Sequence, residues 1–376
     1  MEPNSNNTTK LFYPEASFMV ESPESKIMKA VAISIVGLVA VVGNCLVMAA
    51  VFQSTKLQTV TNYLIVNMAV SDLLYIIIAL PPFYFDLFEL YEWTFSTHIN
   101  RVYFCKIVHF GQYSLPTVSV LTLATIAVDR FFAIAIPLRR IFTKKAFYII
   151  ATAIWLIGAA VASPMFYAQK IKYDDMSGHY YCDEDWSPAF EDTRLASRIY
   201  TLLLFSVVYC VPFMAMTIMY TIICKKLWKR KIPGEQNETN NKTLTESRKK
   251  VVKMLIVVLI AFIVCWLPIQ IISFVWEYAG VDIPLVVYFI CGFLIRTHAS
   301  LSPCIYAIFS ANYRAGFKKA LCYCCVKKND QLIRNDTCSR RPTSYHHIDS
   351  RRNNNGRKDT LVILKTREKM LAKFDD

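Results

Sequence analysis

The fold is decided by the stretch Gly111–Leu138, GQYSLPTVSVLTLATIAVDRFFAIAIPL, a long apolar run that carries an acid–base pair, Asp129–Arg130, near its end. Steps of four and three residues place one set of side chains on a single helix face. They are Gln112, Pro116, Ser119, Leu123, Ile126 and Arg130. That face carries an amide, then a hydroxyl, then a cation. A polar stripe on an otherwise apolar helix predicts a position at the centre of a membrane bundle.

The composition also predicts a membrane protein. Of the 376 residues, 55% are hydrophobic and only 19% are charged, whereas soluble domains are about 45–50% apolar and about a quarter charged. A spanning helix needs roughly 20 apolar residues. Seven runs with at most one charged side chain meet this length: Ala30–Phe52, Thr61–Phe85, Ile107–Val128, Ala146–Gln169, Ile199–Cys224, Met254–Trp276 and Ile283–Ala311. The predicted fold class is therefore all-α, a seven-transmembrane helix bundle.

The basic residues of the short loops predict the orientation. Lysines and arginines follow the first, third and fifth spans, whereas many acids dilute those of the alternate loops. The N-terminus is therefore expected outside and the C-terminus inside. Residues 1–26 lack the apolar segment of a signal peptide, so we expect the first span to direct insertion. The net charge of +14 follows from this bias and a basic tail, and a nucleic-acid partner is not expected.

Two cysteines and two asparagines are expected on the outer side of the membrane, where they could form a disulfide and a glycosylation site. Most of the twelve cysteines lie in spans, where cysteine behaves as a small hydrophobe. Cys105 and Cys182 are expected outside, and an oxidising exterior favours a disulfide between them over two free thiols. Asn6 and Asn7 begin overlapping glycosylation sequons, of which one is expected to be used.

A short amphipathic helix is expected after the seventh span. Within residues 311–321, Phe317 and Leu321 share a face with bases around it, as in a helix that lies on a membrane. The cysteines that follow are candidates for palmitoylation: Cys322, Cys324 and Cys325. A metal site formed with His346 and His347 is the alternative. Residues 326–376 are poor in apolar side chains and are expected to be disordered.

Asp72 is an ionisable residue in the middle of the second span, where a charge is costly unless it is paired or hydrated. Asn44, Ser119 and Ser302 could converge on it from other spans. A carboxylate among hydroxyls suits a hard cation such as sodium. A water-filled polar network without a specific ion is the alternative.

Asp129 and Arg130 lie at the inner end of the third span. The carboxylate can hold the guanidinium while an inner cavity is closed, and opening would free Arg130 to bond a partner. A helix-end ion pair of little energetic weight is the alternative. Prolines in the spans free backbone carbonyls. Trp266 lies two residues before Pro268, where a small ring shift could be amplified into a helix swing, although simple packing would also explain it.

Several motifs occur in order along the chain: Gly43–Val47, Asn67–Asp72, Cys105 with Cys182, Asp129–Phe131, Trp155, Pro212 with Tyr220, Cys265–Pro268 and Ser302–Tyr306. Together they resemble the rhodopsin-like family of G-protein-coupled receptors over about residues 27–325. Two positions depart from the family pattern. Phe131 replaces the usual tyrosine, and Ser302 replaces the Asn or Asp expected before Pro303, which weakens the sodium site by one oxygen ligand.

The resemblance implies a mechanism and a domain organisation. Trp266 and Phe262 would repack, the sixth helix would swing out at Pro268, and Arg130 would leave Asp129. The remaining switch residues would be Pro212, Tyr220, Pro303 and Tyr306. The domains would be an extracellular tail over 1–26, a seven-helix receptor domain over 27–325 and a cytoplasmic tail over 326–376. The implied partners are a heterotrimeric G protein, arrestin and a receptor kinase at the tail, and membrane lipid, all at the plasma membrane.

The class of ligand is inferred from the outer half. Gln112 occupies the position where amine receptors of the family have an aspartate, so a monoamine is not expected, and receptors resembling those for neuropeptide Y, neuropeptide FF and orexin have Gln there. In receptors for peptides that end in Arg-Phe-amide or Arg-Tyr-amide, an acid at the place of Glu277 can hold the peptide arginine. The acidic second outer loop would steer a cationic peptide, although it could also be only a solvated rim. The expected ligand-binding residues are Gln112, Tyr113, Asp183, Glu184, Trp266, Gln270, Glu277 and Arg296.

Arg296 leaves other functions open. It could receive a carboxylate or carbonyl, which would suit a receptor of the same fold for a lipid or another acidic small molecule. It could instead pair with Asp86 or Glu277, or bond Gln112. A transporter or channel would need inverted repeats, which the sequence lacks. An enzyme is not expected, because no nucleophile–base or metal constellation is present.

Overall fold

The computed structural model describes residues 21–88, 98–135, 143–175, 179–229, 238–281 and 283–322. They belong to one compact unit, Met1–Cys324. Seven helices in the described part of the chain are long and apolar enough to cross a membrane, and each contains most of one predicted span. The predictions of seven spans and of an all-α fold class are confirmed. The predicted glycosylation sites Asn6 and Asn7, the tail 326–376, and Cys324 and Cys325 lie outside the described residues.

The first two spans are α1 (Pro23–Gln53) and α2 (Val60–Phe88), joined through a 3₁₀ turn, η1 (Thr55–Leu57). Pro23 opens α1 at a position where its missing N–H leaves no bond unmade. The Ser22 hydroxyl accepts a hydrogen bond from the N–H of Ser25, which caps the helix. The helix thus includes residues 23–26, which were expected in the preceding tail.

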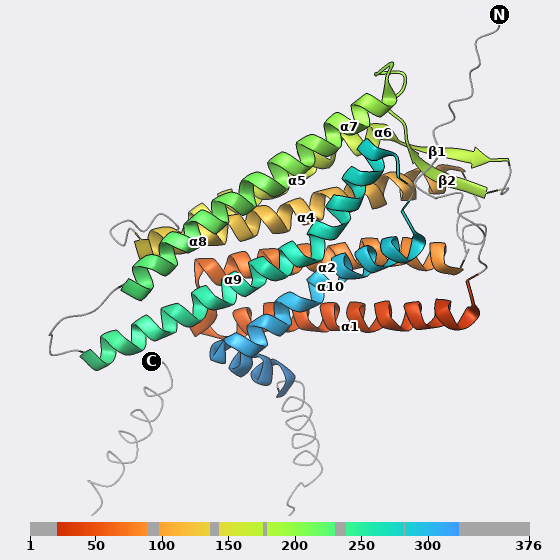
Figure 1. Ribbon diagram of the computed structural model, residues 1–376. Coiled ribbons are helices and arrows are strands. Elements are labelled where there is room, and N and C mark those ends of the chain that lie inside the picture. The colour runs from red at the N-terminus through yellow and green to blue at the C-terminus, as the bar shows by residue number, and fades with distance from the viewer. Residues whose placement is uncertain are drawn as a thin grey trace, which may run out of the picture. The chain divides into compact units, whose positions relative to one another are not determined.

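The central element is α4 (His98–Ala135), which contains the quoted stretch as far as Ala135; residues 136–138 lie outside the described residues. It packs against α2, α5 (Lys144–Ala162) and α8 (Val211–Lys229), and these helices run side by side in Figure 1. Of the predicted inward face, the four middle residues are buried, whereas Gln112 and Arg130 at its two ends are half-buried. The structure therefore confirms the central position that the polar stripe predicted.

The remaining spans contain irregular helical segments. After α6 (Pro164–Ala168), the fifth span runs through α7 (Thr193–Leu203), a π-helical segment η2 (Leu204–Cys210) and α8. Pro212 is the second residue of α8, after Val211. In a regular helix its ring would clash with the carbonyl of residue 208, which lies in η2, so the wider turn relieves the clash. The sixth span comprises α9 (Glu238–Phe274) and the π-helical η3 (Val275–Ala279), and the seventh is α10 (Leu285–Phe309).

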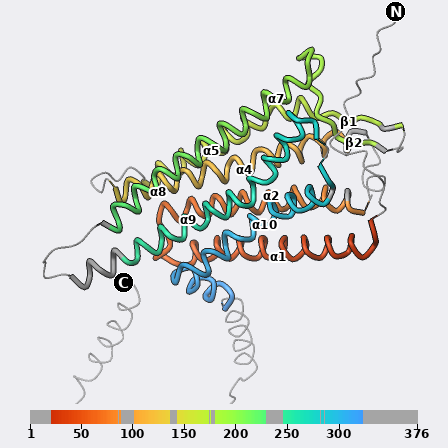
Figure 2. The backbone as a smooth tube through the Cα atoms, viewed as in Figure 1, coloured from red at the N-terminus to blue at the C-terminus, as the bar shows by residue number. Residues whose placement is uncertain are grey.

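An antiparallel hairpin, which was not predicted, follows the fourth span. It consists of β1 (Gln169–Asp174) and β2 (His179–Glu184), with Ile171 opposite Cys182. The predicted disulfide is present and joins Cys182 of β2 to Cys105 of α4. The hairpin therefore marks one end of the bundle, here named the hairpin end, and the side with Arg130 is named the opposite end (Figure 2).

Two glycines let neighbouring helices approach closely. A Cβ atom on Gly158 of α5 would lie 2.8 Å from a methyl carbon of Val118 on α4. A Cβ atom on Gly43 of α1 would lie 2.5 Å from Cγ of Pro303 on α10. Real Cβ atoms do not tolerate such distances, so both contacts depend on glycine.

A further helix over residues 311–322 confirms the predicted helix after the seventh span. Tyr313 and Gly316 are buried on its inner face. The Tyr313 ring stacks on Tyr306 of α10 with 5.3 Å between centroids, and its hydroxyl donates to Oδ1 of Asn62 on α2 at 3.2 Å. Lys319 donates to the carbonyl of Gln53 at the end of α1. This helix therefore holds α1, α2 and α10 together at the opposite end.

Candidate functional site

Asp72 is buried in the middle of α2. The hydroxyl of Ser119 on α4 donates to its Oδ1 at 3.1 Å. Its Oδ2 is buried without a hydrogen-bond partner among the described residues. A buried polar atom without a partner is costly, so this oxygen fits a hard cation or a water molecule. The predicted sodium site is chemically consistent with this geometry.

Asn44 has a different role from the one expected. Its Nδ2 donates to the carbonyls of Ala40 and Ala299, both at 2.9 Å. Ala299 lies four residues before Pro303, so its carbonyl is the one that the proline leaves without an N–H partner. Among the described residues, no hydrogen bond joins Asn44 or the buried Ser302 to Asp72. Asn44 therefore supplies the hydrogen bond that the Ala299 carbonyl of α10 loses because of Pro303.

An aromatic group surrounds Trp266 between Asp72 and the hairpin end. The indole of Trp266 stacks on Phe262 with 5.7 Å between centroids and contacts Tyr75 of α2 and Tyr209 of η2. Phe262 in turn contacts the edge of the buried His298 ring at 4.4 Å. We name the buried cluster that contains Tyr75, Leu115, Phe262 and Trp266 the Trp266 cluster. Close packing means that a shift of one ring displaces the others.

At the opposite end, Arg130 is held by its neighbour and by α2. Its Nε and Nη2 donate to Oδ2 of Asp129 at 3.1 and 2.5 Å. The hydroxyl of Thr61 donates to the same oxygen at 2.6 Å, and Arg130 Nη2 also contacts that hydroxyl. Charge-assisted bonds of this kind are about twice as strong as neutral ones. The Asp129–Arg130 ion pair considered from the sequence is therefore formed in this structure.

Two tyrosine hydroxyls near this end have no hydrogen-bond partner among the described residues. They belong to Tyr220 of α8 and Tyr306 of α10, and both side chains are buried. Both are predicted switch residues. A rearrangement that gives either hydroxyl a partner would gain a hydrogen bond.

At the hairpin end, Glu277 in η3 is paired with Arg198 of α7. The Arg198 guanidinium lies 3.6 Å from Oε1 of Glu277 and donates to the Glu277 carbonyl at 3.1 and 2.9 Å. The Arg198 side chain is 34% exposed, whereas that of Glu277 is 8% exposed. The guanidinium also lies over the Tyr278 ring. The acid expected to hold a peptide arginine thus already holds an arginine of the chain itself.

The other acids of the second loop differ in their contacts. Glu184 of β2 accepts a hydrogen bond from the indole of Trp186 at 2.8 Å. Trp186 packs with Tyr200 and Tyr113 in a small buried cluster. Glu184 therefore lies beside Tyr113, another predicted ligand residue. Gln112 and Gln270 are half-buried.

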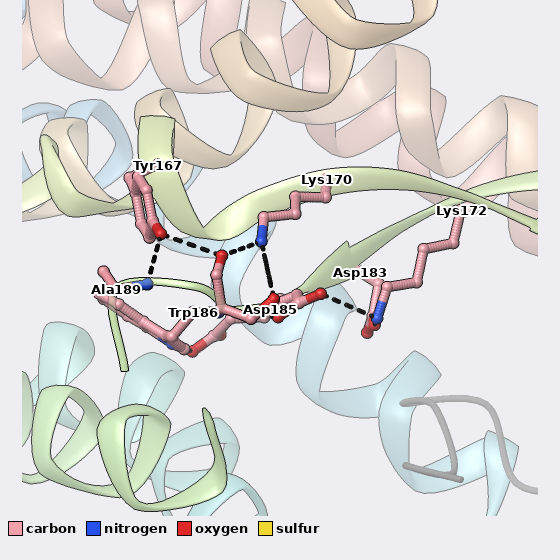
Figure 3. Close-up of polar contacts among 9 residues, drawn as sticks. Tyr167, Lys170, Lys172, Asp183, Asp185, Trp186 and Ala189 are labelled. Atoms are coloured by element: carbon pink, nitrogen blue, oxygen red, sulfur yellow. Dashed lines mark hydrogen bonds and ion pairs between the residues drawn. The ribbon is translucent and has the colours of Figure 1, made fainter. Parts of the chain in front are cut away.

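Asp183 and Asp185 belong to a polar network that holds the hairpin (Figure 3). Asp183 pairs with Lys172 of β1 at 2.5 Å, so it is less available to a ligand than expected. Asp185 accepts from the N–H of Ser187 at 2.9 Å and pairs with Lys170 and Lys172. Burial raises the pKa of Asp185, but the Ser187 bonds and the two lysines outweigh it and lower that pKa to about 2.

Arg296 of α10 donates hydrogen bonds to two backbone carbonyls. Its Nη1 donates to the Gly292 carbonyl and its Nη2 to the Ala79 carbonyl on α2, at 3.0 and 3.1 Å. Its guanidinium carbon lies 5.1 Å from the centroid of the Phe83 ring. The side chain of Asp86, one expected partner, lies outside the described residues.

Comparison with known proteins decides the family. The profile of the 7 transmembrane receptor (rhodopsin family) matches residues 43–306, which is more than half of the chain. The chain belongs to this family. The resemblance drawn from the sequence motifs is confirmed, and so is the expectation that this rhodopsin-family receptor is not an enzyme.

Several known receptors are similar to this receptor in sequence. The receptor is 30% identical to the RYamide receptor of Drosophila melanogaster over 74% of this chain and 60% of the fly protein. It is 31% identical to neuropeptide FF receptor 2 of Rattus norvegicus, over 77% of this chain and 71% of that one. It is 28% identical to the pyroglutamylated RF-amide peptide receptor of the rat, over 84% and 76% of the two chains.

Three residues of this receptor were not singled out as functional from the sequence. Thr61 contacts both members of the Asp129–Arg130 pair, Arg198 pairs with Glu277, and Tyr313 links α10 to α2. Thr61 and Tyr313 lie next to recognised motifs in the sequence, but a single sequence does not show which distant residues they contact. Arg198 is one base among many acids of its loop, and only the structure selects it.

Proposed function

We propose that this receptor spans the plasma membrane with its N-terminus and its hairpin end outside. The basic loops after the first, third and fifth spans support this orientation. The Cys105–Cys182 disulfide at the hairpin end supports it too, because disulfides persist in an oxidising exterior.

The proposed ligand is a neuropeptide with an amidated C-terminus. The names of the relatives support a peptide, and two of them name RYamide or RF-amide peptides. Gln112 supports it because α4 offers no acid there for an ammonium ligand. The proposed contacts are Gln112, Tyr113, Asp183, Glu184, Trp266, Gln270, Glu277 and Arg296, of which Glu277 and Glu184 receive the cationic part of the peptide.

The observation that carries this proposal is the pair of Glu277 and Arg198. Glu277 is buried enough to be a strong acceptor, whereas Arg198 is half-exposed and its side-chain contact with the acid is long, at 3.6 Å. The shorter bonds of Arg198 go to the backbone carbonyl of Glu277 and not to its carboxylate. A peptide guanidinium that forms two parallel bonds to the same carboxylate can therefore replace Arg198.

Ligand binding would act by a population shift. Contacts at the hairpin end favour a repacked Trp266 cluster, and α9 then swings outward about Pro268. Arg130 leaves Asp129 and Thr61 and faces a cavity that admits the C-terminal helix of a G-protein α-subunit. The supporting switch residues are Pro212, Tyr220, Phe262, Pro303 and Tyr306.

Further partners follow from the same proposal. Arrestin and a receptor kinase act at the tail 326–376, and palmitoylation at Cys322, Cys324 and Cys325 anchors the helix 311–322 to membrane lipid. Cys322 is exposed, as acylation requires. A sodium ion at Asp72 acts as an allosteric modulator of agonist binding. Agonist affinity that is the same in sodium and choline chloride, for the natural chain and for Asp72→Asn alike, would contradict the sodium site.

The test uses cells that express the receptor and a panel of peptides with C-terminal amides, with G-protein activation as the readout. Glu277→Gln should reduce the potency of peptides ending in Arg–aromatic–amide by about tenfold or more, the loss of a bond to a charged group. Arg198→Gln is the matched control and should preserve or increase potency. No response across the panel from receptor at the cell surface would refute the peptide proposal.

A second candidate ligand is a lipid or another acidic small molecule. Arg296 favours it, because its guanidinium lies among the backbone carbonyls of α2 and α10, close to the Phe83 ring. Arg296→Gln should abolish the response to such a ligand, whereas Glu277→Gln should leave that response intact. The opposite pattern supports the peptide.

A further inference from the structure

A cavity of about 250 Å³ lies where α4 meets α2 and α5. Its walls include Ile78 of α2, Ile107 and Leu115 of α4, and Ala159 of α5. Gly111 of α4 is also part of the wall, and a Cβ atom there would lie 2.8 Å from Ile78. The cavity therefore lies beside a close contact between helices.

The cavity opens toward the surrounding membrane. Ile107 lines it and is nevertheless 49% exposed, and Leu74 of α2 also lines it and is exposed. Both residues lie inside spanning segments, so the adjacent medium is hydrocarbon. Ile107 is two residues from Cys105, which places the opening in the leaflet at the hairpin end.

The lining is chemically suited to an alkyl chain. Among the described residues that line it there is no charged side chain, and the polar groups are the hydroxyl of Ser114 and the indole of Trp155. That indole already donates to Asn67 at 2.9 Å. A peptide or a charged headgroup would lose its hydration there without a partner. Branched side chains make the wall irregular, which suits a flexible chain better than a rigid ring system.

The cavity wall is also part of the proposed switch. Leu115 lines the cavity and belongs to the Trp266 cluster. Its carbonyl accepts a hydrogen bond from Ser71 at 2.8 Å, and Ser119, one turn further along α4, donates to Asp72. An occupant therefore supports the segment of α4 whose other side faces Asp72 and Trp266.

We propose that this cavity binds one acyl chain of a phospholipid from the leaflet at the hairpin end. The site goes beyond the proposed function, because it depends neither on the peptide nor on Glu277. It is separate from the ligand contacts at the hairpin end, and it opens sideways between α2 and α5.

The experiment uses the full chain in phosphatidylcholine nanodiscs that contain a trace of phosphatidylcholine with a diazirine on its acyl chain. Photolysis, proteolysis and mass spectrometry locate the labelled residues. We expect label on residues 107–118 and 155–159. Ala159→Phe fills the cavity and should lower this label about tenfold, a loss of ~1.4 kcal/mol. Ala160→Phe changes the exposed neighbour and should leave the label unchanged.

Ile107→Trp, which narrows the opening, gives the same test if Ala159→Phe does not fold. Each variant is first checked for monomeric elution and an intact disulfide. Equal label in both alanine variants, or label spread evenly over all lipid-facing helices, would overturn the proposal in favour of ordinary surrounding lipid. Removal of the label by cholesterol, but not by added unlabelled phosphatidylcholine, would overturn it in favour of a sterol.

Discussion

The hydrogen bonds of Arg130 show how contacts of a single side chain can stabilise one conformation of the receptor. Two oxygen atoms restrain Arg130: Asp129 Oδ2 accepts from Arg130 and from the Thr61 hydroxyl, and that hydroxyl oxygen also accepts from Arg130. Thr61 belongs to α2, so the pair is attached to a second helix. Release of Arg130 therefore requires that α2 and α4 lose a shared bond.

The first prediction concerns Thr61. Thr61→Val keeps the shape of the side chain but removes the hydroxyl, and bonds to charged groups contribute about 1.5–3 kcal/mol. Release of Arg130 becomes easier, so agonist-independent nucleotide exchange on a G protein should rise about tenfold. Thr125→Val is the control, because within the described residues the Thr125 hydroxyl bonds to the Leu121 carbonyl of its own helix and to no other helix. Unchanged basal exchange in Thr61→Val would show that Thr61 does not restrain Arg130.

At the scale of elements, the hairpin is held by charges that are insensitive to mild acid. The folded pKa of Asp185 is about 2, below the value of about 3.9 in an unfolded chain. Its stabilising contribution is therefore present above pH ~4 and is lost as the pH falls from there toward 2. Acidification from neutral pH to pH ~5 should leave the hairpin intact.

The second prediction follows from that range. Asp185→Asn should lower the midpoint of thermal unfolding in nanodiscs at neutral pH, because Lys170, Lys172 and the N–H of Ser187 lose a charged acceptor. The difference from the natural chain should stay constant down to about pH 5 and shrink only below about pH 4. Glu191→Gln, at an exposed residue of the same loop, should have no effect. A difference that shrinks already between neutral pH and pH 5 would contradict the assignment to Asp185.

The third prediction concerns the helix over residues 311–322. Tyr313→Phe keeps the ring stacked on Tyr306 but removes the bond to Asn62, so α2 and α10 are less firmly joined and basal G-protein activation should rise severalfold. Tyr313→Ala also leaves a cavity, which typically costs about 3–5 kcal/mol for an aromatic residue. It should therefore reduce the amount of receptor at the cell surface, measured by labelling an N-terminal tag. Equal surface levels and basal activities for both variants would refute this role.

At the scale of the whole molecule, the orientation can be tested through glycosylation. Either Asn6 or Asn7 should carry a glycan if the N-terminus is outside, whereas the sequon at Asn237 should not. A double change of Asn6 and Asn7 to Gln should remove the electrophoretic shift caused by peptide N-glycosidase, and Asn237→Gln should preserve it. The reverse result would invert the proposed topology.

The bundle itself was predictable because its determinants are local. Each span could be predicted from the length of its apolar run and its lack of charged residues. The polar stripe of α4 predicted its central position in the bundle. The hairpin was missed because its strands are short and polar, and they depend on the disulfide and on ion pairs made after folding. The hydrogen-bond partners of individual polar side chains could not be predicted from the sequence either. Asn44 was assigned to Asp72, but it bonds to the carbonyl of Ala299, since the bond depends on where two distant helices touch.

The contact between Gly43 and Pro303 has a consequence for how the receptor can move. The proline ring rests against the backbone of α1, and the neighbouring Asn44 holds the carbonyl that the ring leaves without a partner. The weakest point of α10 is thus braced by α1, so the two helices should travel as one rigid body. Any shift of α10 relative to α2 or α9 during signalling should therefore carry α1 with it.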